Sequence, residues 1–107
     1  MAEAQAGEED GGQGLVTATL TYLAKALVEH PDDVVVSTSP GEGTTTVFRL
    51  VVNPEDMGRV IGRHGRTARA IRQVTRAAAA KAGVGVYIEI VDQGVGGTAR
   101  SDSSPAD

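Results

Sequence analysis

The sequence predicts an α+β domain of order αββααβ, in which a three-stranded sheet is covered by helices on one face. Two patterns predict it. Apolar residues recur at helical spacing over residues 15–30 and 66–82, as in amphipathic helices. Apolar and polar residues alternate over 44–52 and 84–91, as in strands with one buried face. The chain has 107 residues with Gly-rich acidic ends, so the foldable part is a single domain of roughly 75 to 80 residues.

The first half of the chain is expected to form a helix followed by a β-hairpin. The helix should span residues 15–30, because Pro31 disfavours helical backbone at the residue before it. A β-branched run at 34–36 predicts a short strand, and residues 37–43 have the composition of an open loop. The strand at 44–52 closes the hairpin. Its inward face is predicted to hold Phe48, Leu50 and Val52.

The second half begins with two helices. Asn53 is a suitable N-cap and Pro54 a suitable first residue for a helix that can run only to about Ile61. A long helix is predicted over residues 66–82, which are rich in Ala and Arg, and Gly83 is a suitable stop. Between the two helices lies a short glycine-containing segment.

The long helix has two distinct faces. At about 100° per residue, its core face is predicted to hold Ile71, Val74 and Ala78. The opposite face carries Arg66 and three further arginines, which we call the arginine row: Arg69, Arg72 and Arg76. The third strand follows, with one buried face made of Val84, Val86, Ile88 and Ile90.

Charge is divided unevenly along the chain. Residues 57–88 hold seven of the ten Lys and Arg residues and no Asp or Glu, a formal charge of +7. The rest holds all fourteen acidic residues and three basic ones, a charge of -11, and the two sums give the net charge of -4. A one-signed segment of this length favours binding of a polyanion over a merely solvated surface.

The two ends of the chain differ from the middle in composition. Residues 1–14 contain four glycines and four acidic residues, which predicts a flexible acidic arm. Residues 93–107 are rich in Gly, Ser and Asp and are predicted to form a flexible tail. The folded domain is therefore expected to span residues 15–92.

Composition also excludes several classes of protein. Without cysteine there is no disulfide, no thiolate nucleophile and no cysteine metal site. No secretion signal opens the chain, and no stretch approaches the roughly 18 apolar residues of a membrane span. We therefore expect a cytoplasmic protein that does not associate with a membrane and binds neither a metal nor a cofactor. The two histidines lie far apart and the basic segment has no carboxylate, which argues against an enzyme.

The most specific feature is the glycine loop, Gly62-Arg63-His64-Gly65. Glycine tolerates positive φ and has no Cβ, so a phosphodiester can approach the main chain closely. The loop opens into the long helix, whose first-turn N–H groups and dipole attract anions. Arg63 and His64 add side-chain donors. The loop therefore predicts a phosphate-binding site.

In this position the segment Ile61-Gly62-Arg63-His64-Gly65 resembles the Ile-Gly-x-x-Gly signature of KH domains, and the order αββααβ is that of the type II KH arrangement. Residues 54–62, the Ala-Ile-Arg of 70–72 and the alanines of 77–80 resemble the KhpA family of small bacterial proteins with a single type II KH domain. The resemblance covers about residues 15–92.

The KH resemblance implies a clamp for about four nucleotides of single-stranded RNA, or sometimes DNA. Phosphates would lie at the loop residues Gly62, Arg63, His64 and Gly65, with Arg59 and Arg66 adding charge on either side. The apolar groove under the bases would be floored by Val60, Ile61 and Ala68. Residues 37–43 would form the opposite wall, and the arginine row stays outside this primary site.

Binding by such a site should be weak. The three aromatic residues, Tyr22, Phe48 and Tyr87, lie far from the loop in sequence, so little stacking, worth roughly 1 to 3 kcal/mol per base, is expected. Pairing two sites would raise the avidity. The KhpA resemblance implies a homodimer, a complex with a larger KhpB-type RNA-binding protein, and an RNA-chaperone role in post-transcriptional regulation linked to cell elongation and cell-wall homeostasis. We expect the dimer interface to include the exposed part of the loop.

Two other classes remain open at this point. The helices at 54–61 and 66–82 could form a helix-turn-helix that inserts the arginine row into the major groove of DNA. Three predicted strands and a first helix of about two turns argue against it. The chain could also be a protein-interaction module whose loop does not bind RNA.

Overall fold

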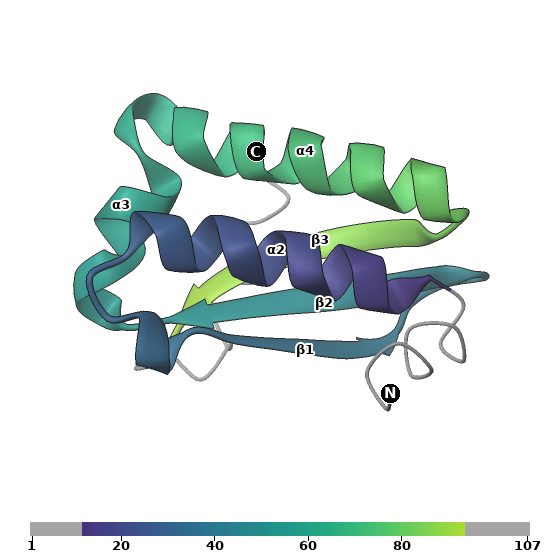
Figure 1. The fold of residues 1–107 in the computed structure, drawn as a ribbon, viewed down its shortest axis with the longest axis horizontal. Coiled ribbons are helices and arrows are strands. Elements are labelled where there is room, and N and C mark those ends of the chain that lie inside the picture. Colours follow the sequence, from purple (N-terminus) through teal and green to yellow (C-terminus); the bar gives the residue numbers. More distant parts are fainter. Residues whose placement is uncertain (1–11, 94–107) are drawn as a thin grey trace.

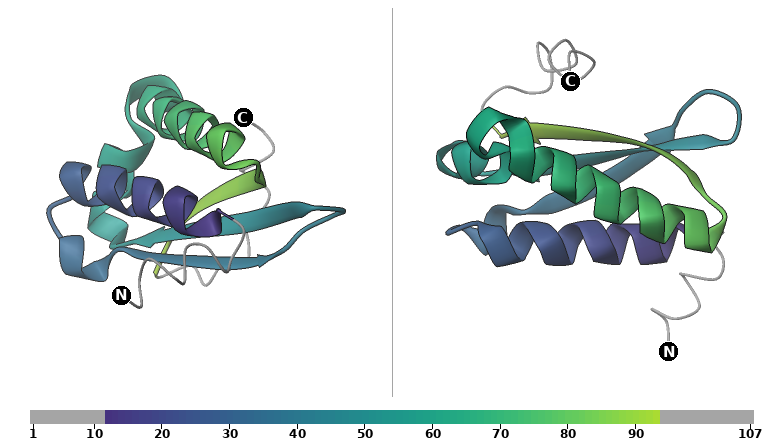
Figure 2. Two further views of the ribbon diagram at one scale, coloured as in Figure 1. Left: turned by 45° about the vertical axis from the view of Figure 1, so that its right-hand side comes forward. Right: turned by 90° about the horizontal axis from the view of Figure 1, so that it is seen from above.

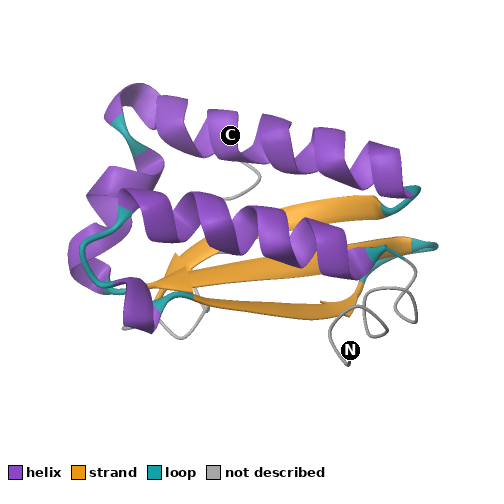
Figure 3. Cartoon of the chain, in the orientation of Figure 1, coloured by secondary structure: helices purple, strands orange, loops and turns teal. Residues whose placement is uncertain are grey.

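The computed structural model describes residues 12–93. The helices α2 (Gln13–Leu27) and α4 (Arg66–Ala82) lie side by side over one face of a three-stranded sheet, and the short α3 (Met57–Ile61) lies at one end (Figures 1 and 3). The predicted α+β class, with helices on one face of the sheet, is confirmed. The predicted acidic arm and tail lie outside the described residues, except for residues 12–14 and Gln93.

Helix α2 starts two residues before its predicted start and ends three residues before its predicted end. It ends because the chain becomes extended at Val28 (φ -96°, ψ 163°). The next two N–H groups, those of Glu29 and His30, then donate to the carboxylate of Asp56 at 3.0 and 3.1 Å. A side chain from a distant segment therefore ends this helix before Pro31 does.

The hairpin consists of β1 (Val35–Pro40) and β2 (Thr45–Val52) in antiparallel register, joined by residues 41–44. The prediction of an open loop over residues 37–43 is wrong in its first half. Residues 37–40 pair with β2 although they are polar, because an edge strand can expose its side chains to water and tolerate a proline at its end.

The sheet has the order β1-β2-β3, and β3 (Gly85–Asp92) runs parallel to the central strand β2. Every second residue of β2 is buried, as predicted, against α2 and α4. The prediction of one buried face is incomplete for β3. Glu89 is also buried, and Arg49 offsets the cost by donating from Nε to Glu89 Oε1 at 3.0 Å. Val91, on the same face, is also buried beside its register partner Val51.

The second half of the chain follows its predicted boundaries closely. The Asn53 side chain accepts a hydrogen bond from the Glu55 N–H at 2.8 Å, as expected of an N-cap, although the first turn is a 3-10 helix. Helix α4 starts and ends as predicted, and Gly83 ends it in the left-handed conformation with φ 76°. Within residues 12–93 no helix is long and apolar enough to cross a membrane.

The core face of α4 differs from the predicted one. It consists of Ala68, Ile71, Thr75 and Ala79. Val74 is 48% exposed and Ala78 is only half-buried, so their assignment to the core is wrong. The buried positions follow a spacing of three and four residues, and Val74 lies beside them on the exposed flank of the helix.

Thr75 gives the first testable prediction. Its hydroxyl is fully buried, and Oγ1 has no hydrogen-bond partner among the described residues. An unpaired buried hydroxyl costs about 1 to 3 kcal/mol, so Thr75→Val should raise the free energy of unfolding by roughly 1 kcal/mol. The urea unfolding midpoint measures this. Thr75→Ser, which keeps the hydroxyl, is the control and should not stabilise the fold; a less stable Val variant would show that the hydroxyl is satisfied in solution.

Candidate nucleic-acid interface

The glycine loop lies where α3 and α4 meet, at one end of the long axis (Figure 1). Helix α3 stops at Gly62, whose backbone (φ 76°, ψ 174°) is reserved almost entirely for glycine. Residues 63–65 form a tight turn in which His64 and Gly65 (φ 74°, ψ 14°) are left-handed, and α4 begins at the next residue. The loop is thus a sharp reversal between two helices.

The two glycines are required for different reasons. A Cβ on Gly62 would overlap the side chain of Thr67 and would lie 2.9 Å from its backbone nitrogen. A Cβ on Gly65 would meet no atom within 4 Å. Gly62 is therefore needed for the fold of the turn, whereas the space beside Gly65 is open to a ligand.

His64 adopts backbone angles that residues other than glycine rarely adopt. With φ 58° and ψ 25° it is the one non-glycine residue between 12 and 93 with positive φ. A left-handed residue costs roughly 1 to 2 kcal/mol. Such strain is often found at binding sites, because the surrounding structure holds the backbone ready for a ligand.

Two backbone N–H groups of the loop donate hydrogen bonds within the protein, and two do not. The N–H of Gly62 donates to Gly58 O at 2.9 Å, and that of Gly65 donates to Gly62 O at 3.1 Å. The N–H groups of Arg63 and His64 have no acceptor within the described part of the chain. The sequence predicts that the glycines let a phosphate reach main-chain N–H groups, without saying which residues supply them. In the structure the glycines shape the turn, and the two residues between them offer the N–H groups.

Positive charge surrounds these two donors. The side chains of Arg63, His64 and Arg66 are exposed, and none forms an ion pair with another residue in the described range. The first turn of α4 contains no acidic residue, although acidic residues there would stabilise the helix dipole. The loop thus combines free N–H groups, a helix N-terminus and three side-chain donors.

Arg59 does not join this set. Its guanidinium binds Glu29 Oε2 at 2.7 Å and lies 4.0 Å from Asp56 Oδ1. The resemblance to KH domains implies that Arg59 adds charge beside the phosphates. The structure instead pairs it with Glu29, just after α2, and with Asp56, just before α3, so the arginines of the site are Arg63 within the loop and Arg66 beside it.

A buried carboxylate anchors α3 at this end of the molecule. Asp56 is 1% exposed and accepts hydrogen bonds from the N–H groups of Glu29 and His30 and from His30 Nδ1, the last at 3.0 Å. Sequence reasoning missed this cluster, because nothing in the local sequence relates residues 29–30 to residue 56. The cluster fixes α3, and therefore the start of the glycine loop, against the end of α2.

The anchor shifts the pKa of both partners. The hydrogen bond to Asp56 raises the pKa of His30 above its usual value, and the charges of Asp56, Glu55 and Asp33 add to this against the opposing effect of burial. Burial acts to raise the pKa of Asp56, but hydrogen bonds from Glu29 and His30 outweigh it, so this pKa is lowered.

These shifts give a pH prediction. The His30 contribution to stability is present below its unfolded pKa of about 6.5 and is lost as the pH rises through the higher folded pKa. The Asp56 contribution is present above about 3.9 and is lost as the pH falls through its lower folded pKa. The anchor should therefore stabilise the fold most between about pH 4 and 6.5. The difference in urea midpoint between the parent and His30→Gln should shrink from pH 6 to 8.5; a constant difference would contradict the assignment.

The predicted floor of the groove needs correction. Val60 and Ala68 are 0% and 3% exposed and belong to the hydrophobic core, so they support the surface and do not form it. Ile61 is half-buried and packs at the edge of the core, next to Gly62. Of the three predicted residues, only Ile61 can touch a base.

A second apolar stripe was not predicted. Thr67, beside Gly62, lies on the same flank of α4 as Val74 and Ala78, at spacings of seven and four residues. Val74 is 48% exposed. Sequence periodicity alone placed Val74 in the core, because an exposed valine on a helix resembles a buried one in sequence. With Ile61, this flank provides an apolar surface that begins at the glycine loop.

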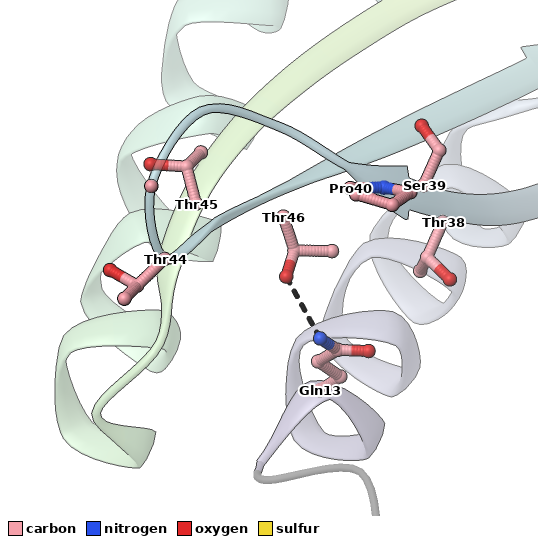
Figure 4. Close-up of a pocket in the computed structure, with 8 residues that line it drawn as sticks. Gln13, Thr38, Ser39, Pro40, Thr44, Thr45 and Thr46 are labelled. Atoms are coloured by element: carbon pink, nitrogen blue, oxygen red, sulfur yellow. Dashed lines mark hydrogen bonds between the residues drawn. The ribbon is translucent and has the colours of Figure 1, made fainter.

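The KH resemblance implies that residues 37–43 form the wall of the groove opposite the glycine loop. The hairpin turn does not lie there. Residues 41–44 lie at the opposite end of the long axis from the glycine loop (Figure 2). There they border a shallow hollow of about 360 Å³ lined mainly by hydroxyl groups (Figure 4). Gln13 Nε2 donates to Thr46 Oγ1 across it at 2.8 Å. This hollow is separate from the glycine loop.

An αββααβ domain with a Gly-x-x-Gly turn between its second and third α-helices is a type II KH domain. The family model described as the KhpA/KhpB KH domain matches residues 17–90, more than half of the chain. Within residues 12–93 there is no cluster of three His, Asp or Glu residues that would hold a metal ion.

Named relatives agree with this class. The chain is 49% identical over 71 residues to the RNA-binding protein KhpA of Halalkalibacterium halodurans, covering 66% of this chain and 92% of that protein. It is 50% identical over 72 residues to KhpA of Clostridium acetobutylicum, covering 67% and 95%. It is 47% identical over 79 residues to KhpA of Leifsonia xyli subsp. xyli, covering 73% and 99%. The chain belongs to the KhpA/KhpB KH-domain family, which is not a family of enzymes, as predicted.

A solved structure shows the same fold at lower similarity. The structure of Era in complex with MgGDPNP and nucleotides 1506-1542 of 16S ribosomal RNA matches with a TM-score of 0.51 and 20% identity. The match covers 72% of this chain but only 29% of the Era chain. The likeness to Era therefore concerns the fold of this domain alone.

Proposed function

We propose that this protein binds single-stranded RNA, with the phosphate backbone held at the glycine loop and the bases over the apolar flank of α4. The observation that carries the proposal is the pair of unused N–H groups of Arg63 and His64, which lie beside exposed side chains of positive charge. The names of the relatives, RNA-binding protein KhpA, support RNA as the ligand.

The residues have distinct roles in this proposal. Gly62 shapes the turn, Gly65 leaves room for a phosphate, and Arg63, His64 and Arg66 supply donors. Bases would contact Ile61 and the flank formed by Thr67, Val74 and Ala78. Since no aromatic side chain belongs to this set, stacking adds little and base preference should be weak.

A binding series tests the proposal directly. Fluorescence anisotropy would measure the affinity of the protein for a 12-nucleotide unstructured RNA, the matching single-stranded DNA and a DNA duplex, across a salt series. We expect the RNA to bind with a salt-dependent affinity and the duplex to bind more weakly, because only unpaired bases can reach the apolar flank. Equal or tighter binding of the duplex would contradict the proposal.

The alternatives weighed from the sequence predict other results. A helix-turn-helix protein would prefer the duplex, but α3 spans only Met57–Ile61 and the fold is that of a KH domain. An interaction module would bind none of the three nucleic acids by itself.

We further propose that the protein acts in the cytoplasm as an RNA chaperone, as a homodimer or with a KhpB-type partner, in post-transcriptional regulation linked to cell elongation and cell-wall homeostasis. Weak binding by one small site supports coupling to a second site, which raises avidity without new contacts. Light scattering across protein concentrations measures self-association. If the dimer interface includes the glycine loop, added RNA should shift the mass toward the monomer; an unchanged mass would place the interface elsewhere.

A further inference from the structure

The arginine row on α4 has no role in the site described above. Arg69 and Arg76 lie seven residues apart, which places them on one side of the helix and about 10.5 Å apart along its axis. Both are exposed, and neither forms an ion pair with another described residue. No acidic residue occurs anywhere on α4, or elsewhere in residues 57–88.

Local structure alone does not explain the row. Arg66 and Arg69 lie near the positive end of the helix dipole, and arginines spaced three and four residues apart repel each other along one side of α4. An ordinary solvated helix would alternate charges of both signs. The arrangement works against the helix and favours an external anion.

The row also has a definite place relative to the loop. Arg66 follows Gly65 directly, so positive charge continues without interruption from Arg63 to Arg76. The apolar flank that contains Val74 lies on the other side of α4, roughly 160° away from Arg76 at 100° per residue. A short strand lying over the apolar flank therefore does not reach the row.

We propose that Arg69 and Arg76 of this row form a second phosphate-binding surface, which takes the backbone of an RNA strand after it has passed the glycine loop. Arg66 and Arg76 lie about 15 Å apart along the axis, a span of about four nucleotides at roughly 3.4 Å each in a stacked strand. This inference rests on the proposed RNA binding at the loop. It extends the footprint from the groove onto the outer surface of α4, through charge and not through base contacts.

RNA length separates the two surfaces experimentally. The parent and Arg69→Gln/Arg76→Gln would be titrated with a 5-nucleotide and a 12-nucleotide unstructured RNA. On the longer RNA, the double variant should lose about tenfold in affinity. Its slope of log K against log salt, which is negative, should become about 1.4 less steep, for two lost phosphate contacts at about 0.7 each. On the shorter RNA, the loss should stay below about twofold.

Two control variants make the result specific. Arg69→Lys/Arg76→Lys keeps the charge and should keep most of the long-RNA affinity, because a phosphate also accepts a Lys point charge. Lys25→Gln removes one exposed charge from α2 and should change both affinities equally and slightly. Circular dichroism would check that every variant is folded.

The outcomes distinguish this inference from the function on which it rests. If the double variant loses the same factor on both RNAs, or no more than Lys25→Gln does, the second surface is refuted while RNA binding at the loop stands. If Arg63→Asp/His64→Asp binds both RNAs as tightly as the parent, the loop is not the site and both proposals fail. If the parent binds neither RNA, both proposals fail as well.

Discussion

Replacing both central loop residues, in the variant Arg63→Asp/His64→Asp, should lower the affinity for single-stranded RNA by about 100-fold or more. The change removes two side-chain donors and places two carboxylates beside the free N–H groups. Each charge-assisted hydrogen bond contributes about 1.5 to 3 kcal/mol, and about 1.4 kcal/mol corresponds to a factor of ten. Anisotropy titration with a short RNA measures the loss.

The fold should survive this change. Both side chains are exposed and neither is paired within the described residues, and Asp tolerates the left-handed backbone of position 64 better than most residues. An unchanged urea midpoint with lost binding would assign the effect to the site. If the variant bound RNA within a few-fold of the parent, phosphate binding by the loop would be refuted.

The largest expected effect on stability comes from Gly62→Ala. The backbone conformation at position 62 (φ 76°, ψ 174°) is costly for any residue with a Cβ. The new Cβ would also overlap the side chain of Thr67 and lie 2.9 Å from the Thr67 backbone nitrogen. Because Thr67 belongs to the first turn of α4, the helix start or the turn has to move. We expect a loss of about 3 kcal/mol in the free energy of unfolding, measured by urea denaturation.

Gly65→Ala is the matched control for this prediction. It also places a Cβ on a residue with positive φ, but in space that no atom occupies within 4 Å. Its cost should be only about 1 kcal/mol. Its main effect should be on RNA affinity, because the added methyl group occupies the approach to the loop. Equal destabilisation by the two variants would contradict the separate roles assigned to the glycines.

Local sequence signals were sufficient for most of the fold. The ends of α4 followed from Arg-rich and Ala-rich composition and from Gly83, and the alternation in β2 identified its buried face. The errors came from distant contacts. Helix α2 ended early because Asp56 binds the N–H groups after it, and the polar residues 37–40 became a strand because β2 supplied partners.

The candidate site was predicted in position but not in detail. The loop residues lie together because they are adjacent in sequence, and the side chains of Arg63 and His64 are exposed. The roles of Val60, Ala68 and Arg59 depend on packing and on Glu29, which the local pattern does not contain. Likewise, the two free N–H groups became evident only once the hydrogen bonds of the loop were known.

The central claim is that the N–H groups of Arg63 and His64 hold a phosphate of single-stranded RNA. The most direct measurement is an NMR titration of 15N-labelled protein with a short unstructured RNA. The account predicts that the amide signals of Arg63 and His64 shift most, downfield, followed by those of Gly65 and Arg66. Unchanged loop signals during saturable RNA binding, with the shifts concentrated elsewhere on the sheet or at the hairpin turn, would contradict it.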